Sequence, residues 1–424
     1  MDEQVYHEYV AILKEELQPA MGCTEPIAVA YCAALARKTL GALPETVEVL
    51  ASANIIKNVK SVIVPNTNGQ RGIAAAAAAG IISGNADAQL QVLASLTPEQ
   101  VDAVGAYLQQ AAFTVRRTDK DYVFNIQVRV TAGADSASVE IAGYHTNVIR
   151  IEKNGVVQFH KDYQESGSQH ATDRSLLTVE QIIAFANEVD VADVQETLKR
   201  QIDYNWAIAE EGLRGDYGAN IGRILLQSYG MSIHNRAKAY AAAGSDARMN
   251  GCDLPVVINS GSGNQGLTAS LPVIVYAKEL GVTQQMLYRA LVVSNLVTIH
   301  LKTGIGSLSA YCGATAAGCG AAAGVTYLYG GQYREIAHTI VNAIAIDSGM
   351  ICDGAKASCA AKIASAVEAG LLGMQMQMHE SQFYGGDGIV VKGVENTIRN
   401  IGTLASEGMR ETDRTIIRMM IQEH

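Results

Sequence analysis

Three cysteines in the last third of the chain are the residues whose types and spacing most favour chemistry. Cys312, Cys352 and Cys359 lie in stretches rich in glycine and alanine, SLSAYCGATAAGCGAAAG and SGMICDGAKASC, with few charged neighbours. Thiolates are preferred ligands of zinc and of iron–sulfur clusters. Three protein ligands in place of four would leave one metal position open for a substrate, as in catalytic zinc sites. If the three thiols share one centre, the sequence predicts an enzyme with a Lewis-acidic metal.

The spacing indicates which cysteines can act together. Cys312 and Cys319 lie seven residues apart in a stretch that should be continuous helix, which separates them by about 10.5 Å along the helix axis at 1.5 Å per residue. One compact cluster does not easily bridge that gap, so Cys319 is expected to be a small core residue. Cys352 and Cys359 are also seven apart, but the turn-forming pair Asp353-Gly354 follows Cys352. A loop there could bring both thiols to one centre.

A further cysteine lies at a predicted helix start near the N-terminus. Cys23 belongs to the string GCTEP, just before a helix whose first turn can hold Pro26. Because a helix N-terminus lowers the pKa of a thiol, we predict that Cys23 is catalytic, as a general base or a nucleophile, or that it is a fourth metal ligand. The alternative is helix capping alone, with Thr24 as the cap and Glu25 in the first turn.

A glycine-rich loop follows the apolar run LPVVIN. The string Gly261-Ser262-Gly263-Asn264-Gln265-Gly266 matches the pattern G-x-G-x-x-G. A dinucleotide site would also have an acidic residue about 20 positions further on and a surrounding βαβ unit, and the sequence supplies neither. We expect instead that backbone N–H groups of this loop bind a small carboxylate. The alternative is a tight turn between packed elements.

Several other polar side chains are candidates for substrate contacts. Two of them lie in the loop PNTNGQRG and two at a strand end, GYHTN, while a lysine in HLKTGIGS precedes the first cysteine segment. That lysine, Lys302, could bind a carboxylate or form a Schiff base with pyridoxal phosphate. The predicted substrate-binding residues are Thr24, Asn66, Asn68, His145, Thr146, Ser262, Asn264 and Lys302.

An α+β fold is predicted to position these residues. Apolar periodicity predicts helices in residues 5–17, 27–40 and 98–112, and after Arg71. Residues 46–64 are predicted to be strand, and period-two alternation in residues 122–157 predicts three short strands. From about Leu176 onward we find helical patterns interrupted by glycine turns. We therefore predict an N-terminal α/β domain with an antiparallel meander (residues 1–165), a polar linker near 162–175, and a large Ala/Gly-rich α-helical domain (172–424).

The composition excludes some classes of protein. The chain has 424 residues, of which 48% are hydrophobic and 17% charged, so it can bury a large core. Its net charge of -10, without a run of lysine or arginine, argues against nucleic-acid binding. We find no signal peptide and no apolar run long enough to span a membrane, so a cytoplasmic protein without a membrane partner is expected. Its Gly/Ala-rich surfaces are compatible with a homo-oligomer.

Six motifs together resemble one known family: GCTEP, VPNTNG, GYHTN, GSGNQG, AYCG and CDGAKASC. Over essentially the whole chain, their combination is similar to the L-cysteine desulfidases, including a bacterial branch long described as uncharacterised, which are related to the α region of iron–sulfur L-serine dehydratases. The resemblance implies an oxygen-sensitive [4Fe-4S] cluster held by Cys312, Cys352 and Cys359, with an open iron for the leaving group. It also puts Cys23 at the position suggested for the base or an additional cluster contact.

The reaction implied by this resemblance is β-elimination of L-cysteine to pyruvate, ammonia and sulfide. A base would remove the Cα proton, and the resulting aminoacrylate would hydrolyse. The tail RMMIQEH lacks the cysteine that some serine dehydratases use, and no separate regulatory segment is found, which favours cysteine as the amino-acid substrate. The alternatives are an L-serine dehydratase on the same site, a pyridoxal-dependent lyase using Lys302 or Lys356, and a non-enzymatic amino-acid-binding protein.

Overall fold

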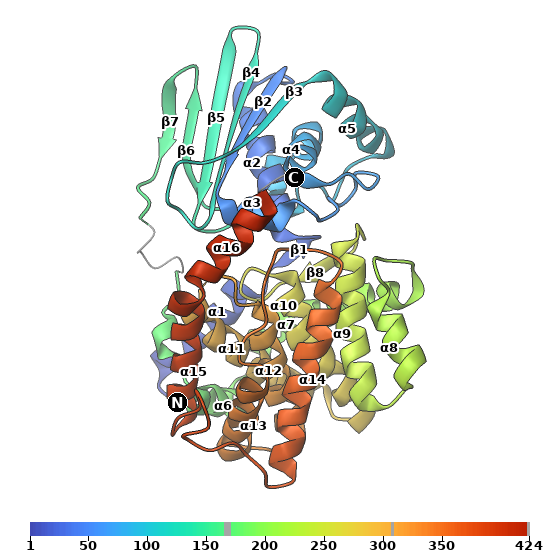
Figure 1. Cartoon of the computed structure of the whole chain (residues 1–424), viewed down its shortest axis with the longest axis vertical. Coiled ribbons are helices and arrows are strands. Elements are labelled where there is room, and N and C mark those ends of the chain that lie inside the picture. The colour runs from blue at the N-terminus through green and yellow to red at the C-terminus, as the bar shows by residue number, and fades with distance from the viewer. Residues whose placement is uncertain (165–170, 307–308, 422–424) are drawn as a thin grey trace.

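The chain folds into a sheet-containing domain joined to a larger helical body, as the computed structural model shows (Figure 1). The structure describes residues 1–164, 171–306 and 309–421. The predicted α+β class is confirmed, because a mixed sheet in the N-terminal region is followed by long helices. Within those described ranges, no helix combines the length and the apolar character needed to cross a lipid bilayer.

A six-stranded sheet forms the centre of the α/β domain. Its strand order is β3-β2-β4-β5-β6-β7, in which β2 and β3 are parallel and all other neighbours are antiparallel. The strands are β2 (Thr46–Ala51), β3 (Ala112–Arg117), β4 (Asn125–Ala132), β5 (Asp135–Ala142), β6 (Val148–Lys153) and β7 (Val156–His160). The predicted meander is confirmed in β4, β5 and β6, while β3 and β7 are strands that the sequence analysis did not separate.

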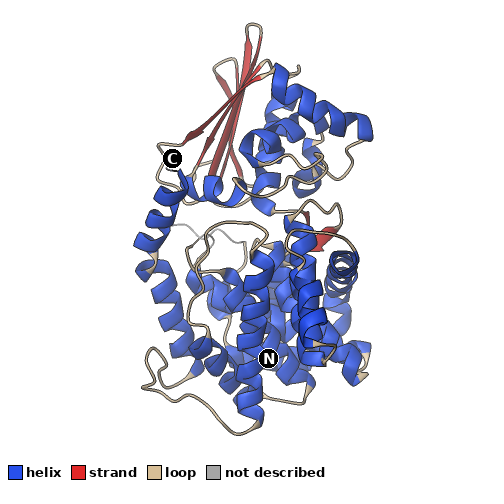
Figure 2. Ribbon diagram, turned by 45° about the vertical axis from the view of Figure 1, so that its right-hand side comes forward, coloured by secondary structure: helices blue, strands red, loops and turns tan. Residues whose placement is uncertain are grey.

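Helices cover one face of this sheet, as Figure 2 shows. α2 (Thr24–Leu40) and α4 (Gly72–Ser83) pack against each other. The small residues of α2 meet the inward side chains of β4 and β5, such as Val128 and Val139, while α4 contacts β2 and β3. α5 (Pro98–Gln110) extends this layer beyond α4. The predictions of a helix in residues 27–40, after Arg71 and near 98–112 are confirmed.

The prediction that residues 46–64 form strand is wrong in its second half. β2 ends at Ala51, and Ser52 directly precedes the short helix α3 (Ala53–Val59). Apolar residues Ile55 and Val59 suggested a strand, but both are fully buried on one side of a helix, because residues four apart share a helix face. The polar side chains of α3 lie elsewhere: Lys57 forms an ion pair with Asp413, and Asn58 donates to Glu25.

The helical body consists of long helices rich in alanine and glycine. Its helices are α1 (Glu3–Glu16), α6 (Val179–Glu188), α7 (Val191–Arg214), α8 (Ile221–Tyr229), α9 (Ile233–Met249), α10 (Gly263–Leu280), α11 (Gln284–Ile305), α12 (Gly313–Leu328), α13 (Tyr333–Ile346), α14 (Cys359–Met378), α15 (Val394–Thr403) and α16 (Arg410–Ile421). The predicted helical region is confirmed, with one exception. The short strand β8 (Pro255–Val257) pairs antiparallel with β1 (Pro19–Met21).

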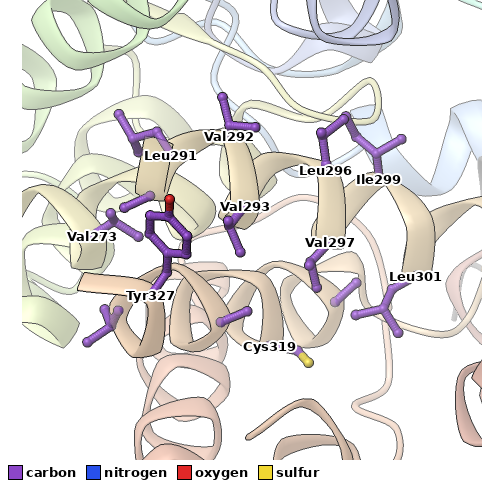
Figure 3. Close-up of a cluster of buried hydrophobic side chains, with 14 of the residues drawn as sticks. Val273, Leu291, Val292, Val293, Leu296, Val297, Ile299, Leu301, Cys319 and Tyr327 are labelled. Carbon is purple, nitrogen blue, oxygen red and sulfur yellow. The ribbon is translucent and has the colours of Figure 1, made fainter. Parts of the chain in front are cut away.

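The helices α11 and α12 form the centre of the hydrophobic core. Figure 3 shows Val293 and Val297 of α11 facing α12, and Cys319 on the side of α12 away from α11. Cys319 is 3% exposed, and its thiol lies 3.8 Å from the carbonyl oxygen of Ile340. The prediction that Cys319 is a small core residue is therefore confirmed.

Glycine allows these helices to approach one another closely. A Cβ atom added to Gly318 of α12 would lie 2.4 Å from the carbonyl oxygen of Ala366 in α14. One added to Gly320 would lie 2.1 Å from the hydroxyl oxygen of Thr298 in α11. Because the interior is close-packed, any side chain at these positions would push the helices apart.

The helices α1 and α16 each pack against the body that is not next to them in the sequence. Although α1 precedes the α/β domain, its apolar face packs into the helical core, where the ring centroids of Tyr9 and Phe185 lie 5.3 Å apart. The predicted division into residues 1–165 and 172–424 had placed α1 with the sheet. The predicted linker includes residues 165–170, which lie outside the described residues. At the other end, α16 leaves the helical body and packs against α3 (Figure 1).

Candidate active site

A cavity of about 1230 Å³ lies between the two bodies. The α/β domain lines it with residues of α2, α3 and the turn after β5, and the helical body with the first residues of α10, α12 and α14. Eight predicted site residues line this cavity: Cys23, His145, Ser262, Asn264, Lys302, Cys312, Cys352 and Cys359. The fold thus brings together side chains that are far apart in the sequence.

Four predicted substrate contacts lie outside this lining: Thr24, which follows Cys23 in the chain, and Asn66, Asn68 and Thr146. Asn66 and Asn68 are turn residues with φ angles of 55° and 54°. The Asn66 amide donates to the carbonyl of Leu93 at 2.9 Å, and the Asn68 amide donates to Asp102 at 3.2 Å. Thr146 follows His145 but is not part of the cavity wall among the described residues. The structure therefore gives both asparagines a place in turn geometry and does not bring Thr146 to the site.

Two loops hold Cys312 and Cys352 side by side. The backbone amide of Cys312 donates to the carbonyl of Met350 at 2.9 Å, and that of Cys352 donates to the carbonyl of Ala310 at 2.7 Å. Cys312 immediately precedes α12, and Cys359 is the first residue of α14. Cys352 lies in the loop before α14, and all three thiols line the same cavity.

The surroundings of Cys352 favour its thiolate form. A hydrogen bond between the thiols of Cys312 and Cys352 raises the pKa of Cys312 and lowers that of Cys352. The positive charges of Lys57 and Lys362 lower the pKa of Cys352 further. Gly354 allows the backbone of Lys57 to approach the loop that carries Cys352. The φ of Gly354 is 95°, and a Cβ added to it would lie 2.3 Å from the Lys57 carbonyl oxygen. Thiolates are the form of cysteine that binds metals.

Cys312, Cys352 and Cys359 are the thiols of the cavity lining that could hold a cofactor. In the part of the chain that the structure describes, no three His, Cys, Asp or Glu side chains are arranged so that they could hold a metal ion. An iron–sulfur cluster is larger and takes its cysteine thiolates on different irons. Lys57, Lys302 and Lys362 place positive charge near the thiols of Cys312 and Cys352, which would suit an anionic group held there.

Cys23 lies at the start of α2 as predicted, but it is held as a thiol. Its Sγ donates to Glu25 Oε2 at 3.1 Å. Burial, followed by the negative charge of Glu25, raises the pKa of Cys23, so the predicted lowering by the helix N-terminus is wrong. Thr24 is not the cap either: Cys23 occupies that position without a capping bond, while the Thr24 hydroxyl lies 3.0 Å from Glu25 and 2.9 Å from the carbonyl of Gly261.

Glu25 is a partly buried carboxylate that the sequence analysis placed only in a helix turn. Burial alone would raise its pKa, but the charge of His145, the hydrogen bond from Cys23 and the charge of Arg248 hold the pKa below its usual value. The amide of Asn58 donates to its Oε1 at 3.1 Å. Burial lowers the pKa of His145, whose Nε2 has no hydrogen-bond partner among the described residues.

Arg248 and Gln265 also line the cavity, and the sequence analysis missed both. Arg248 is 2% exposed and Gln265 is 6% exposed, yet the Arg248 Nε and the Gln265 Oε1 have no hydrogen-bond partner in the described ranges. The Asn264 Oδ1 likewise has no hydrogen-bond partner among the described residues. A signal was present in the sequence, because Arg248 is a charged residue among the small residues of AYAAAGSDARM.

Lys302 faces the cysteines from α11. Burial lowers its pKa to about 8, while the charges of Cys352 and Cys312 act in the opposite direction. Its ammonium donates to the carbonyl of Gly306 at the end of its own helix. The other lysine considered for a Schiff base, Lys356, forms an ion pair with Asp353.

Thiols and a partly buried carboxylate line one cavity, and the chain also matches one known family. The model of the family described as "Serine dehydratase alpha chain" matches residues 87–418, which is more than half of the chain. The chain belongs to the serine dehydratase alpha chain family. This membership confirms the predicted relation to serine dehydratases and indicates a lyase of amino-acid catabolism.

Relatives of similar length extend this likeness to both ends of the chain. A UPF0597 protein of Desulfitobacterium hafniense is 56% identical over 421 residues, covering 99% of this chain and 98% of the relative. A UPF0597 protein of Lachnoclostridium phytofermentans is 49% identical over 417 residues, covering 98% and 100%. One of Treponema denticola is 45% identical over 429 residues, covering 100% of both chains.

Proposed function

We propose that this protein is an iron–sulfur-dependent lyase that converts L-cysteine to pyruvate, ammonia and sulfide by β-elimination. One observation carries the proposal: Cys312, Cys352 and Cys359 line the same cavity as the hydrogen-bonded pair Cys23 and Glu25. Metal-binding thiols and a proton acceptor are the two components that such an elimination needs. Membership of the serine dehydratase alpha chain family supports a lyase.

The three cysteines would hold a [4Fe-4S] cluster, which when bound supplies a Lewis-acidic iron for the departing group. We assign the proton transfer at Cα to Cys23 and Glu25. When Glu25 takes the Cys23 proton, the thiolate can accept the proton from Cα. The electrons of the C–H bond then form the Cα–Cβ double bond, and the bond from Cβ to its substituent breaks. The aminoacrylate product hydrolyses to pyruvate and ammonia.

L-serine is the second candidate substrate, because the matching family is that of serine dehydratases. The same steps would apply to serine, with hydroxide leaving in place of sulfide. Cysteine is proposed first because its thiolate is the softer ligand and the better leaving group for an iron site.

An anaerobic assay of both amino acids tests this proposal. With L-cysteine we expect pyruvate and sulfide in equal amounts, and a higher kcat/KM than with L-serine. A higher kcat/KM with L-serine would make the protein a serine dehydratase. Protein that contains a full cluster but forms pyruvate from neither amino acid would overturn the lyase assignment. The variant Cys23→Ala should keep its iron and lose turnover.

A further inference from the structure

Arg248 presents a buried positive charge that forms no ion pair within the part of the chain that the structure describes. Its side chain is 2% exposed, its Nε is unpartnered, and its guanidinium forms no ion pair with a described residue. Burying a charge without a partner costs several kcal/mol, so such groups are normally paired. The guanidinium lines the cavity, so a negatively charged ligand there could pair with it.

Two glycines keep space for the polar side chains at this place. A Cβ atom on Gly263, the first residue of α10, would lie 2.2 Å from Arg248 Nε. A Cβ atom on Gly313, the first residue of α12, would lie 2.5 Å from the Gln265 side-chain carbon Cδ. Arg248 and Gln265 are therefore seated directly against the first turns of two helices.

The same two helices begin at the cavity without a side-chain cap. Ser262 precedes α10 and Cys312 precedes α12, and neither makes a capping hydrogen bond. Backbone N–H groups in the first turn of a helix need partners from outside the helix. Together with the positive end of the helix dipole, such N–H groups form a common binding site for anions.

We infer that Arg248, with the first turns of α10 and α12, binds the α-carboxylate of the substrate. This assignment rests on the proposed function, which makes an α-amino acid the ligand. A guanidinium can bind a carboxylate through two parallel hydrogen bonds, which fixes orientation as well as position. The charge of Arg248 also acts on Cys23 and Glu25. A carboxylate held here would bring the adjacent Cα to the residues assigned to proton transfer.

Thermal unfolding of the anaerobically purified full chain tests this carboxylate site separately from catalysis. L-alanine has no leaving group and serves as the probe, and L-alaninamide is the matched ligand without the carboxylate. We expect L-alanine to raise the unfolding temperature and L-alaninamide to leave it unchanged. In Arg248→Met the affinity for L-alanine should fall about thirtyfold or more. Equal stabilisation by both ligands, or undiminished L-alanine binding in Arg248→Met, would overturn the assignment.

The stability of the variants without ligand distinguishes a binding role from a structural one. Because Arg248 forms no ion pair with a described residue, Arg248→Met should unfold at the same or a higher temperature than the unchanged protein. Arg174 is the matched control, since it is also buried but forms ion pairs with Glu16 and Glu15. Arg174→Met should unfold at a lower temperature. A loss of stability in Arg248→Met equal to that in Arg174→Met would show a structural role.

A second variant keeps the test decisive if Arg248→Met does not fold. Arg248→Lys keeps the charge and loses the two parallel hydrogen bonds, so it should bind L-alanine with intermediate affinity. Unreduced L-alanine affinity in this variant would contradict the guanidinium's role. If the protein binds L-alanine through Arg248 but lacks iron and lyase activity, the proposed function fails and the carboxylate site stands.

Discussion

The thiol of Cys23 donates a hydrogen bond to the carboxylate of Glu25 across 3.1 Å, at the wall of the cavity between the two bodies. The two residues flank the first residue of α2, so the helix start fixes their relation. Burial and the Glu25 charge keep the proton on sulfur in the resting protein. Removal of a substrate proton by Cys23 therefore depends on Glu25, which makes the carboxylate the residue to alter.

Replacing Glu25 with Gln should separate the effect of the Glu25 charge on the Cys23 pKa from the role of Glu25 as proton acceptor. Because the negative charge of Glu25 raises the pKa of Cys23, Glu25→Gln should lower that pKa. Alkylation of Cys23 by iodoacetamide, followed by peptide mass spectrometry, should then begin at a lower pH than in the unchanged protein. Turnover should fall about 100-fold or more, because the proton acceptor is lost.

The control for this experiment is Cys32, a buried thiol against the sheet whose pKa is raised chiefly by burial. Its alkylation should show no change in Glu25→Gln. An unchanged or higher alkylation pH for Cys23 would contradict the coupling between the two residues.

The C-terminal helix should contribute stability through one buried ion pair. Lys57 Nζ of α3 lies 2.5 Å from Asp413 Oδ1 of α16, and the two side chains are 2% and 15% exposed. Removing one partner leaves a buried charge unpaired, so Lys57→Met should lower the free energy of unfolding by about 3 kcal/mol. Urea denaturation measures this loss.

An exposed pair provides the comparison for that measurement. Lys199 Nζ also lies 2.5 Å from Asp203 Oδ2, but the two side chains are 61% and 52% exposed. Because solvent screens such a pair, Lys199→Met should cost less than about 0.5 kcal/mol. Similar losses in the two variants would refute a stabilising contact between α16 and α3.

Close helix packing predicts opposite effects for two helix glycines. Gly318→Ala would place a Cβ 2.4 Å from the Ala366 carbonyl oxygen, and we expect a loss of about 3 kcal/mol from overpacking. Gly105 in α5 has only the Gln70 side chain near an added Cβ, at 3.9 Å. Gly105→Ala should therefore stabilise the protein by up to about 1 kcal/mol through helix propensity. Two changes of the same sign, measured by urea denaturation, would contradict this account of the packing.

Much of the fold could be predicted from periodicity, because long helices repeat their apolar residues over several turns. The α5 helix and the strands β4 and β5 are examples. The error in residues 46–64 has a local cause: Ile55 and Val59 suit a strand by residue type, and tertiary packing decides that they belong to a helix. The packing of α1 on the helical body could not be predicted, since its apolar face does not specify its partner.

The site could be predicted where residue type alone limits the chemistry. Cys312, Cys352 and Cys359 were selected as soft ligands, and the structure places them on one cavity. Glu25 and Arg248 were missed because their importance comes from burial, which depends on contacts between distant segments. Asn68 lies outside the cavity lining, in a left-handed turn, a conformation that asparagine favours as it favours binding loops.

Iron and acid-labile sulfide content tests the central claim most directly. Protein purified without oxygen should contain about four of each per chain. Cys312→Ser, Cys352→Ser and Cys359→Ser should each lose most of both elements, whereas Cys319→Ser, which alters a core thiol, should keep them. Absence of both elements from the unchanged protein, even after anaerobic reconstitution, or full retention in Cys352→Ser, would contradict the proposed cluster site.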